Sequence, residues 1–83
     1  MKVQIRYFAS VREALGRSNE SVETQADTLT ALRDELIARG GDYAVTLARG
    51  KAVRMALDQV MSDEAAALHE NCEVAFFPPV TGG

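Results

Sequence analysis

The sequence predicts an α+β fold in which one main amphipathic helix packs across one face of a mixed β-sheet. Three patterns support this prediction: apolar–polar alternation in residues 2–7, a helical apolar stripe in residues 27–41, and an apolar run in residues 73–77 closed by two prolines. A helix with one apolar stripe and a sheet with one buried face complement each other in a two-layer domain. At 83 residues, the chain can build one core but not two.

The first element is a strand over "KVQIRY", residues 2–7. Val3, Ile5 and Tyr7 alternate with polar residues, and this period of two indicates a strand with one buried face. A second, polar strand over "ESVET", residues 20–24, is expected to return antiparallel beside the first.

A short helix is expected between these strands, in "SVREALG", residues 10–16. Ser10 is the candidate N-cap, because its hydroxyl can accept a hydrogen bond from a free backbone N–H of the first turn. Gly16 is the expected stop, because glycine adopts the left-handed conformation that ends many helices.

The main helix is predicted over "DTLTALRDELIARGG", residues 27–41, with Asp27 or Thr28 as N-cap and Gly40 as C-cap. Charged residues at positions 33–35 are expected on its solvent-facing sides. Its apolar residues recur at i, i+3, i+7 and i+8, which gives a single stripe that can face a sheet: Leu29, Leu32, Leu36 and Ile37.

A further short helical piece is expected over residues 42–48, followed by a β-hairpin over residues 53–62. The alternation in the hairpin changes parity across Asp58 and Gln59, as a tight two-residue turn requires. Another turn is expected at residues 69–72, where the asparagine can adopt the left-handed conformation.

The last strand is predicted over residues 73–77, because Pro78 and Pro79 remove two backbone donors and end any ladder that the strand has joined. This strand and the first are the most apolar, so we expect them to lie side by side in the centre of the sheet. A parallel pairing of the two needs a long crossover, which the helix supplies.

We expect a domain over residues 1–77 and a flexible C-terminal tail over residues 78–83 that ends in Gly82 and Gly83. Glycine loses more backbone freedom on ordering than any other residue, which favours a mobile end. Six extended residues reach about 20 Å, enough to enter the active site of a neighbouring protein. Either the Gly-Gly ending is accidental, or the mobility of the tail and its free carboxylate serve the function of the chain.

Composition excludes several classes of protein. The net charge of −3 disfavours nucleic-acid binding, which needs a basic surface. No apolar run approaches the roughly 18 residues of a membrane span, and no signal peptide is recognisable, so we expect a cytoplasmic protein without membrane contact. A single cysteine, Cys72, excludes an internal disulfide framework and an all-cysteine metal site within one chain.

Two segments resemble a known family. The order of elements and the terminal Gly-Gly resemble ubiquitin-like β-grasp proteins, including the prokaryotic sulfur carriers. More narrowly, "AFFPPVTGG", residues 75–83, and "YFASVREALG", residues 7–16, resemble the small, sulfur-carrier subunit of molybdopterin synthase. The resemblance covers the whole chain in length and element order, and the tail is its most specific part.

The resemblance implies that Gly83 is a covalent carrier. A partner akin to ubiquitin-activating enzymes would use ATP to adenylate the Gly83 carboxylate, and a persulfide donor would then convert it to a thiocarboxylate. The sulfur would pass to a pterin precursor in molybdenum cofactor biosynthesis. The chain itself would bind no cofactor or metal.

The resemblance also implies a large synthase subunit as partner, in an assembly of two small and two large subunits. The catalytic side chains would belong to that partner, so the chain is not expected to be an enzyme on its own. Thr81 and Gly82 belong to the inserted tail, and because Gly82 and Gly83 lack Cβ atoms the tail can pass a narrow channel.

Aromatic residues predict where the partner docks. Phe76 and Phe77 are neighbours on a strand, so their side chains point to opposite faces, and the same holds for Tyr7 and Phe8. One ring of each pair then lies on the outer face of the sheet, unless loops cover it, and an exposed apolar patch on a small domain marks a partner surface. The expected partner-binding residues are Phe8, Met61, Phe77, Pro78 and Val80, with Arg6, Arg12 and Lys51 as candidates for polar contacts.

Other chemically active side chains favour ordinary structural roles. Cys72 is expected to be incidental, since the neighbouring acidic residues disfavour a reactive thiolate. His69, the only histidine, is expected to be a solvated turn residue. Four carboxylates are expected to form a solvated acidic face, because they lack the loop spacing of an EF-hand calcium site: Asp63, Glu64, Glu70 and Glu73.

Three alternative functions remain open from the residues. The first is a sulfur carrier of another pathway, such as thiamin or cysteine synthesis. The second is a ubiquitin-like protein modifier that forms an isopeptide bond through Gly83. The third is an interaction domain with an inert tail.

Overall fold

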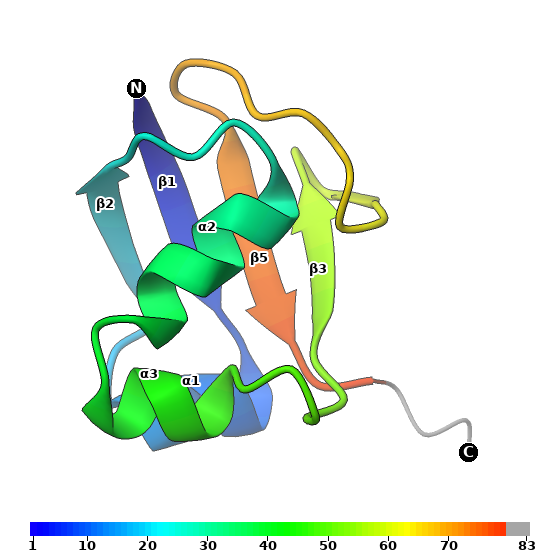
Figure 1. The fold of residues 1–83 in the computed structure, drawn as a ribbon. Helices are drawn as coiled ribbons and strands as arrows, with labels where there is room; N and C mark the ends of the chain where they lie inside the picture. Colours follow the sequence, from blue (N-terminus) through cyan, green and yellow to red (C-terminus); the bar gives the residue numbers. More distant parts are fainter. Residues whose placement is uncertain (80–83) are drawn as a thin grey trace.

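A computed structural model describes residues 1–79 of the chain (Figure 1). Residues 80–83 lie outside the described part, and with them the predicted tail residues Val80, Thr81, Gly82 and Gly83. Within residues 1–79 the strands are β1 (Lys2–Tyr7), β2 (Asn19–Glu23), β3 (Arg54–Leu57), β4 (Val60–Met61) and β5 (Glu73–Phe77). The helices are α1 (Ala9–Leu15), α2 (Leu29–Ile37) and α3 (Gly41–Thr46).

The sheet is mixed, with the strand order β2-β1-β5-β3-β4. The first and last strands, β1 and β5, pair in parallel at its centre, with Ile5 opposite Val74 and Tyr7 opposite Phe76. All other pairs are antiparallel. The predicted central parallel pair and the returning second strand are both confirmed, and so is the α+β architecture.

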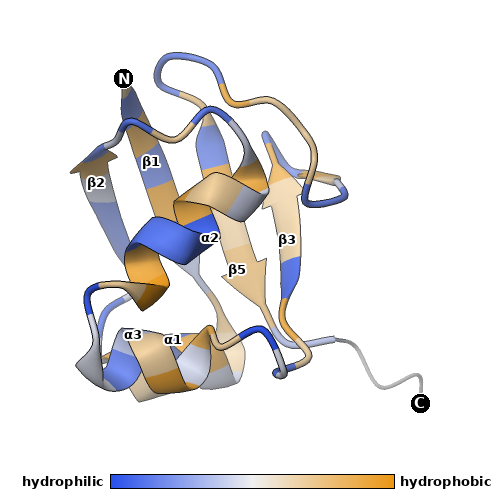
Figure 2. Ribbon diagram, viewed as in Figure 1, coloured by the Kyte–Doolittle hydropathy of each residue, from blue (hydrophilic) through white to orange (hydrophobic). Residues whose placement is uncertain are grey.

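Helix α2 lies across one face of the sheet, while α1 and α3 pack together near the end where β1 and β5 finish (Figure 1). The predicted apolar stripe of α2 is buried, with Leu29, Leu32 and Leu36 at most 1% exposed. Beneath it, the rings of Tyr7 and Phe76 stack with centroids 6.0 Å apart. Figure 2 shows hydrophilic and hydrophobic residues alternating along β1, while most of β5 is hydrophobic.

The predicted N-cap of the main helix is confirmed at Thr28, whose hydroxyl accepts a hydrogen bond from the backbone N–H of Ala31. The predicted C-cap at Gly40 is wrong. The helix ends at Ile37 with Ala38 as its C-cap. Gly40, at φ 77°, instead begins α3, because only glycine readily adopts the left-handed backbone of that tight junction.

Helix α1 also begins earlier than predicted. Phe8, in extended conformation, is its N-cap and has no side-chain capping bond, so Ser10 lies inside the first turn instead of capping it. The predicted stop is confirmed, since Gly16 adopts the left-handed conformation at φ 72° and its N–H bonds to the carbonyl of Arg12.

Both predicted turns have the expected backbone. Asp58 and Gln59 have φ values of 49° and 69°, the paired left-handed geometry of a two-residue hairpin turn. Asn71 has φ 64° in the turn before β5. The Asp58 carboxylate also accepts a hydrogen bond from the backbone N–H of Glu73 at 2.9 Å, which ties the hairpin to the start of β5.

Arg33 differs from its predicted solvent-facing position, because it is only 3% exposed. Its guanidinium donates hydrogen bonds to the backbone carbonyls of Leu47 and Ala48, both at 2.8 Å. These carbonyls belong to the segment between α3 and β3, which makes no regular ladder of its own. Arg33 therefore fixes the segment that leads into β3.

Candidate functional site

The outer face of the sheet carries one ring from each of the two predicted aromatic pairs. Tyr7 and Phe76 point inward and are at most 1% exposed, so Phe8 and Phe77 point outward. Phe8 is 40% exposed, whereas Phe77 is half-buried. The backbone N–H of Phe8 bonds to the carbonyl of Phe76 at 3.1 Å, which holds the two aromatic positions together at the end of the central strands.

The strand register extends this apolar surface across β3 and β4. Ala75 pairs with Ala56, and Ala56 pairs with Met61, so these three side chains lie in one row on the outer face. Met61 is 59% exposed, while both alanines lie beneath longer neighbours. We define the outer patch as the apolar side chains that this register places on the solvent-facing side of the sheet: Phe8, Ala56, Met61, Ala75 and Phe77.

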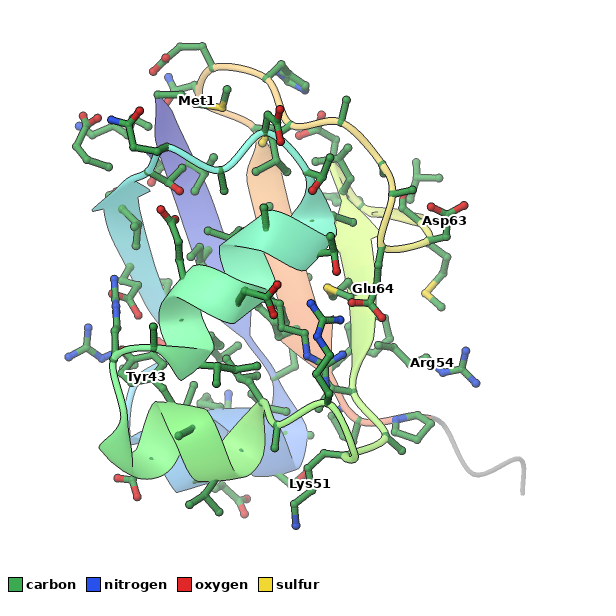
Figure 3. The ribbon with its side chains drawn as sticks, in the orientation of Figure 1. Met1, Tyr43, Lys51, Arg54, Asp63 and Glu64 are labelled. Carbon is green, nitrogen blue, oxygen red and sulfur yellow. The ribbon has the colours of Figure 1, made fainter. Side chains whose placement is uncertain are left out.

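Two arginines flank the outer patch. Arg6 pairs with Ala75 on one side of β5, and its guanidinium lies 5.7 Å from the centroid of the Phe8 ring. Arg54 pairs with Phe77 on the other side. Figure 3 shows the Arg54 side chain extending from β3 away from the domain. Arg6 was expected from the sequence as a polar contact for the partner, whereas Arg54 was not. The alternation of Met55 with its neighbours nevertheless places position 54 on the outer face.

The chain leaves the sheet next to this patch. Phe77 ends β5, and Pro78 follows it on the side of the helices, where it lines a groove of about 330 Å³. The exposed side chain of Val45 borders the groove, and Lys51 contributes a charge. The groove is lined by residues from α1, α3, the segment before β3, and Pro78: Ser10, Val11, Ala14, Val45, Thr46, Lys51, Ala52, Val53 and Pro78. Pro78 therefore lies between the outer patch and this groove.

The cysteine and the histidine lie in different surroundings. Cys72 is 1% exposed within the core. His69 is solvent-exposed, and its Nε2 lies 2.6 Å from the Asp58 carboxylate, a contact that the sequence did not indicate. This hydrogen bond raises the pKa of the His69 imidazole. Within residues 1–79, no histidine, cysteine and carboxylate side chains gather in a group that could hold a metal ion.

The four carboxylates proposed as one acidic face lie in different surroundings. Glu64 pairs with Arg49 and lies 3.9 Å from the Arg33 guanidinium, on the helix side of the molecule. Glu73 lies 3.8 Å from Arg6 on the outer face. Glu70 accepts a hydrogen bond from the backbone N–H of Lys2. Asp63 accepts a hydrogen bond from the backbone N–H of Ala65 at 2.8 Å.

These features define the class of protein. A mixed sheet with a central parallel pair of first and last strands, crossed by one helix, is the ubiquitin-like β-grasp architecture. The archaeal modifier protein SAMP1 from Haloferax volcanii superposes with a TM-score of 0.79 at 21% identity, over all of both chains. A Pyrococcus furiosus protein described as a putative molybdopterin converting factor, subunit 1, gives a TM-score of 0.79 at 22% identity over 96% of this chain and 99% of its own.

The chain belongs to the ThiS family, whose sequence profile matches residues 5–83. The molybdopterin synthase sulfur carrier subunit of Escherichia coli is 37% identical over 81 residues, which cover 98% of this chain and 99% of that protein. The subunit of the same name from Haemophilus influenzae is 35% identical with the same coverage. The resemblance that the sequence indicated is confirmed. Within residues 1–79, no helix has the length and apolar character needed to cross a membrane.

One solved structure with this fold contains a second subunit. It is a complex of subunits 1 and 2 of the molybdopterin-converting factor from Helicobacter pylori, with a TM-score of 0.70 at 24% identity over all of both chains.

Proposed function

We propose that this chain is the sulfur-carrier subunit of a molybdopterin synthase and that the Gly83 carboxylate is its point of sulfur attachment. The main support is the similarity to two molybdopterin synthase sulfur carrier subunits over nearly their whole length. The fold adds a second argument, because the chain leaves the sheet between an exposed apolar face and a groove. A tail that starts beside a docking surface can enter a partner's active site while the domain stays bound outside.

The chemistry starts from a carboxylate, which is a poor acyl electrophile because its leaving group is oxide. In the proposed scheme an adenylating enzyme joins the Gly83 carboxylate to the α-phosphorus of ATP and releases pyrophosphate. A persulfide sulfur displaces AMP, and a dithiol reductant then cleaves the resulting S–S bond and is itself oxidised to a disulfide. This leaves the thiocarboxylate on Gly83 and restores the donor's thiol.

The partner in the second half of the cycle is the large synthase subunit, in an assembly of two small and two large chains. It docks on the outer patch, with Phe8, Met61 and Phe77 in the contact and Pro78 and Val80 at the start of the inserted tail. Thr81 and Gly82 then lie in the partner's channel, where catalytic side chains of the large subunit act on the pterin precursor. We place these steps in the cytoplasm.

An alternative is a protein modifier that forms an isopeptide bond through Gly83. The specific observation in its favour is the fold likeness to SAMP1, although the 21% identity supports the fold and not the activity. A sulfur carrier of another pathway shares the chemistry of Gly83 and differs only in the acceptor.

Mass spectrometry separates these functions. The chain is incubated with its adenylating enzyme, ATP and a persulfide donor, and intact masses are recorded before and after. We expect a gain equal to the replacement of one oxygen by sulfur, located on the C-terminal fragment. Conjugates of high mass support the modifier, and an unchanged mass contradicts both carriers. Co-purification of the large synthase subunit, followed by transfer of the sulfur to the pterin precursor, separates the two carrier pathways.

Deletion of Gly83 tests whether the tail acts only in chemistry. We expect the variant to gain no sulfur and to keep the thermal transition of the full chain within about 2 °C, because substitutions away from packed features usually change stability by less than about 0.5 kcal/mol. A large loss of stability contradicts the proposal, since the tail would then be part of the fold.

A further inference from the structure

We propose that the arginines beside the outer patch select the partner, so that the docking surface of the large subunit carries carboxylates opposite Arg6 and Arg54 around an apolar centre. This inference rests on the proposed function and adds the chemistry that the partner must have. It follows from the positions, the exposure and the incomplete pairing of the two guanidinium groups.

The two arginines hold fixed positions relative to the aromatic residues. Arg54 lies opposite Phe77 in the β3–β5 register, and Arg6 lies opposite Ala75 in the β1–β5 register. The two cations therefore stand on the two sides of β5, next to the point where the chain leaves the sheet. Any protein that covers Phe77 must also approach both guanidinium groups.

The positive charges are only weakly compensated. Within residues 1–79, Arg54 forms no ion pair. Arg6 reaches Glu73 at 3.8 Å, and its side chain is 51% exposed. Long, exposed pairs of this kind contribute little. Arg54 lines one pocket with Asp63 and Glu64 but forms an ion pair with neither carboxylate.

Covering this surface without carboxylates would be unfavourable. An arginine removed from water without a partner costs several kcal/mol, whereas a carboxylate can accept two parallel hydrogen bonds from its planar guanidinium. The contact of Arg6 with the Phe8 ring orients that guanidinium before docking, which reduces the side-chain entropy lost in the complex. A large subunit with an apolar centre and flanking carboxylates therefore binds, and one with a basic or neutral rim is rejected.

Charge reversal tests this inference with a matched control on the same face. Arg54→Glu and Arg6→Glu each change the net charge by the same amount as Lys2→Glu. Lys2 also points to the outer face of β1, but it lies four positions before Arg6, which is about 13 Å along the strand. This exceeds the Debye length of about 8 Å at physiological ionic strength, so the control reports the effect of net charge alone.

The readout is the affinity for the large subunit of the same organism, measured by calorimetry at low and at physiological salt. We expect each arginine reversal to weaken binding about tenfold or more at low salt, with a smaller salt dependence than that of the unmodified chain. The affinity of Arg54→Lys should lie between those of the unmodified chain and Arg54→Glu, since lysine keeps the charge but lacks the planar guanidinium. At physiological salt, where this separation exceeds the Debye length, Lys2→Glu should stay within about a factor of two. Thermal transitions of the variants confirm that they fold.

The outcomes distinguish this inference from the proposed function. If the unmodified chain binds the large subunit and the arginine reversals bind equally well, the selective role of the arginines is wrong while the proposed function stands. If the unmodified chain binds no large subunit at either salt concentration, both are overturned. Restored binding of Arg54→Glu to a large subunit with a carboxylate exchanged for arginine would identify the matching position.

Discussion

The Glu20 carboxylate accepts hydrogen bonds from the hydroxyl groups of both Tyr7 and Tyr43, at 2.8 and 2.7 Å. One acidic side chain of β2 thereby joins β1 to α3. Arg17 and Arg39 also donate hydrogen bonds to it, at 3.1 and 3.0 Å. Because Tyr7 is 1% exposed, its hydroxyl has no access to water as a substitute acceptor. This cluster links the sheet to the helices at the end where the C-terminal segment begins.

Replacing Glu20 should destabilise the fold strongly. Glu20→Ala leaves the buried Tyr7 hydroxyl and two guanidinium groups without their acceptor, and we expect the free energy of unfolding to fall by about 2–4 kcal/mol. Glu20→Gln keeps one acceptor oxygen and should lose about half as much. Urea denaturation at neutral pH measures both. An alanine variant as stable as the unmodified chain would contradict this role of Glu20.

The same carboxylate gives a predicted pH dependence. Burial raises the pKa of Glu20, but the hydrogen bonds from Tyr43, Arg39 and Tyr7 outweigh it and lower the pKa below the ordinary value of 4.5. A lowered pKa in the folded state means a stabilisation that is complete above pH 4.5 and lost as the pH falls through the lowered value. The stability difference between the unmodified chain and Glu20→Gln should therefore shrink in acid. A constant difference down to pH 2 would contradict it.

His69 should show the opposite dependence. Its hydrogen bond to Asp58 raises the pKa of the imidazole above the ordinary 6.5. The resulting stabilisation is complete below pH 6.5 and lost as the pH rises through the raised pKa. A nuclear magnetic resonance titration should give a lower pKa for His69 in Asp58→Asn than in the unmodified chain. Equal values in the two proteins would mean that the contact does not persist in solution.

Arg33 should stabilise the segment before β3 through its geometry as well as its charge. Besides Leu47 and Ala48, its guanidinium reaches the carbonyl of Lys51 at 3.4 Å. We expect Arg33→Lys to lose about 2–3 kcal/mol, because one ammonium cannot satisfy carbonyls in several directions. Hydrogen exchange should accelerate in residues 47–53 first. Protection unchanged in that segment would show that other contacts hold it.

Phe77 should contribute to docking more than to stability. It is half-buried on the outer face, and aromatic residues at the centre of an interface often account for 2 kcal/mol or more of binding. We expect Phe77→Ala to weaken binding to the large subunit about 30-fold or more. Val45→Ala is the control, because Val45 is a more exposed apolar residue, at 65%, and lies on the helix side, away from the outer patch. Similar losses in both variants would contradict docking through the outer patch.

The sequence predicted the sheet well, because its signals are local. Alternation placed Val3, Ile5 and Tyr7 in the core, and the two adjacent aromatic pairs followed the same rule. The hairpin turn was visible as a change of parity at Asp58 and Gln59. The central pairing of β1 with β5 followed from their composition. These features depend on side-chain periodicity, which is visible in the sequence without knowledge of the tertiary contacts.

The polar clusters could not be predicted in this way. Glu20 lies in β2, whereas Arg39 and Tyr43 lie at and after the junction of α2 and α3, and no spacing rule connects Glu20 to the other two. Arg33 was expected to face solvent from its charge alone, but the carbonyls that it satisfies belong to a segment 14 or more residues away. The C-terminal end of the main helix was also predicted wrongly, because Gly40 is the N-cap of the next helix. The role of Gly83 lies outside the described residues and stays a proposal.

The central place of β5 has a consequence for biosynthesis. Residues 73–77 insert between β1 and β3, so the hydrogen-bond ladder on both sides is incomplete until the ribosome has released them. The earlier segments can form helices and a hairpin, but their shared core closes only around the last strand, and such non-local pairing is slow. Under the proposed function, an activating enzyme that recognises the folded sheet would therefore meet only chains that include β5, and translation products truncated before Glu73 would escape adenylation.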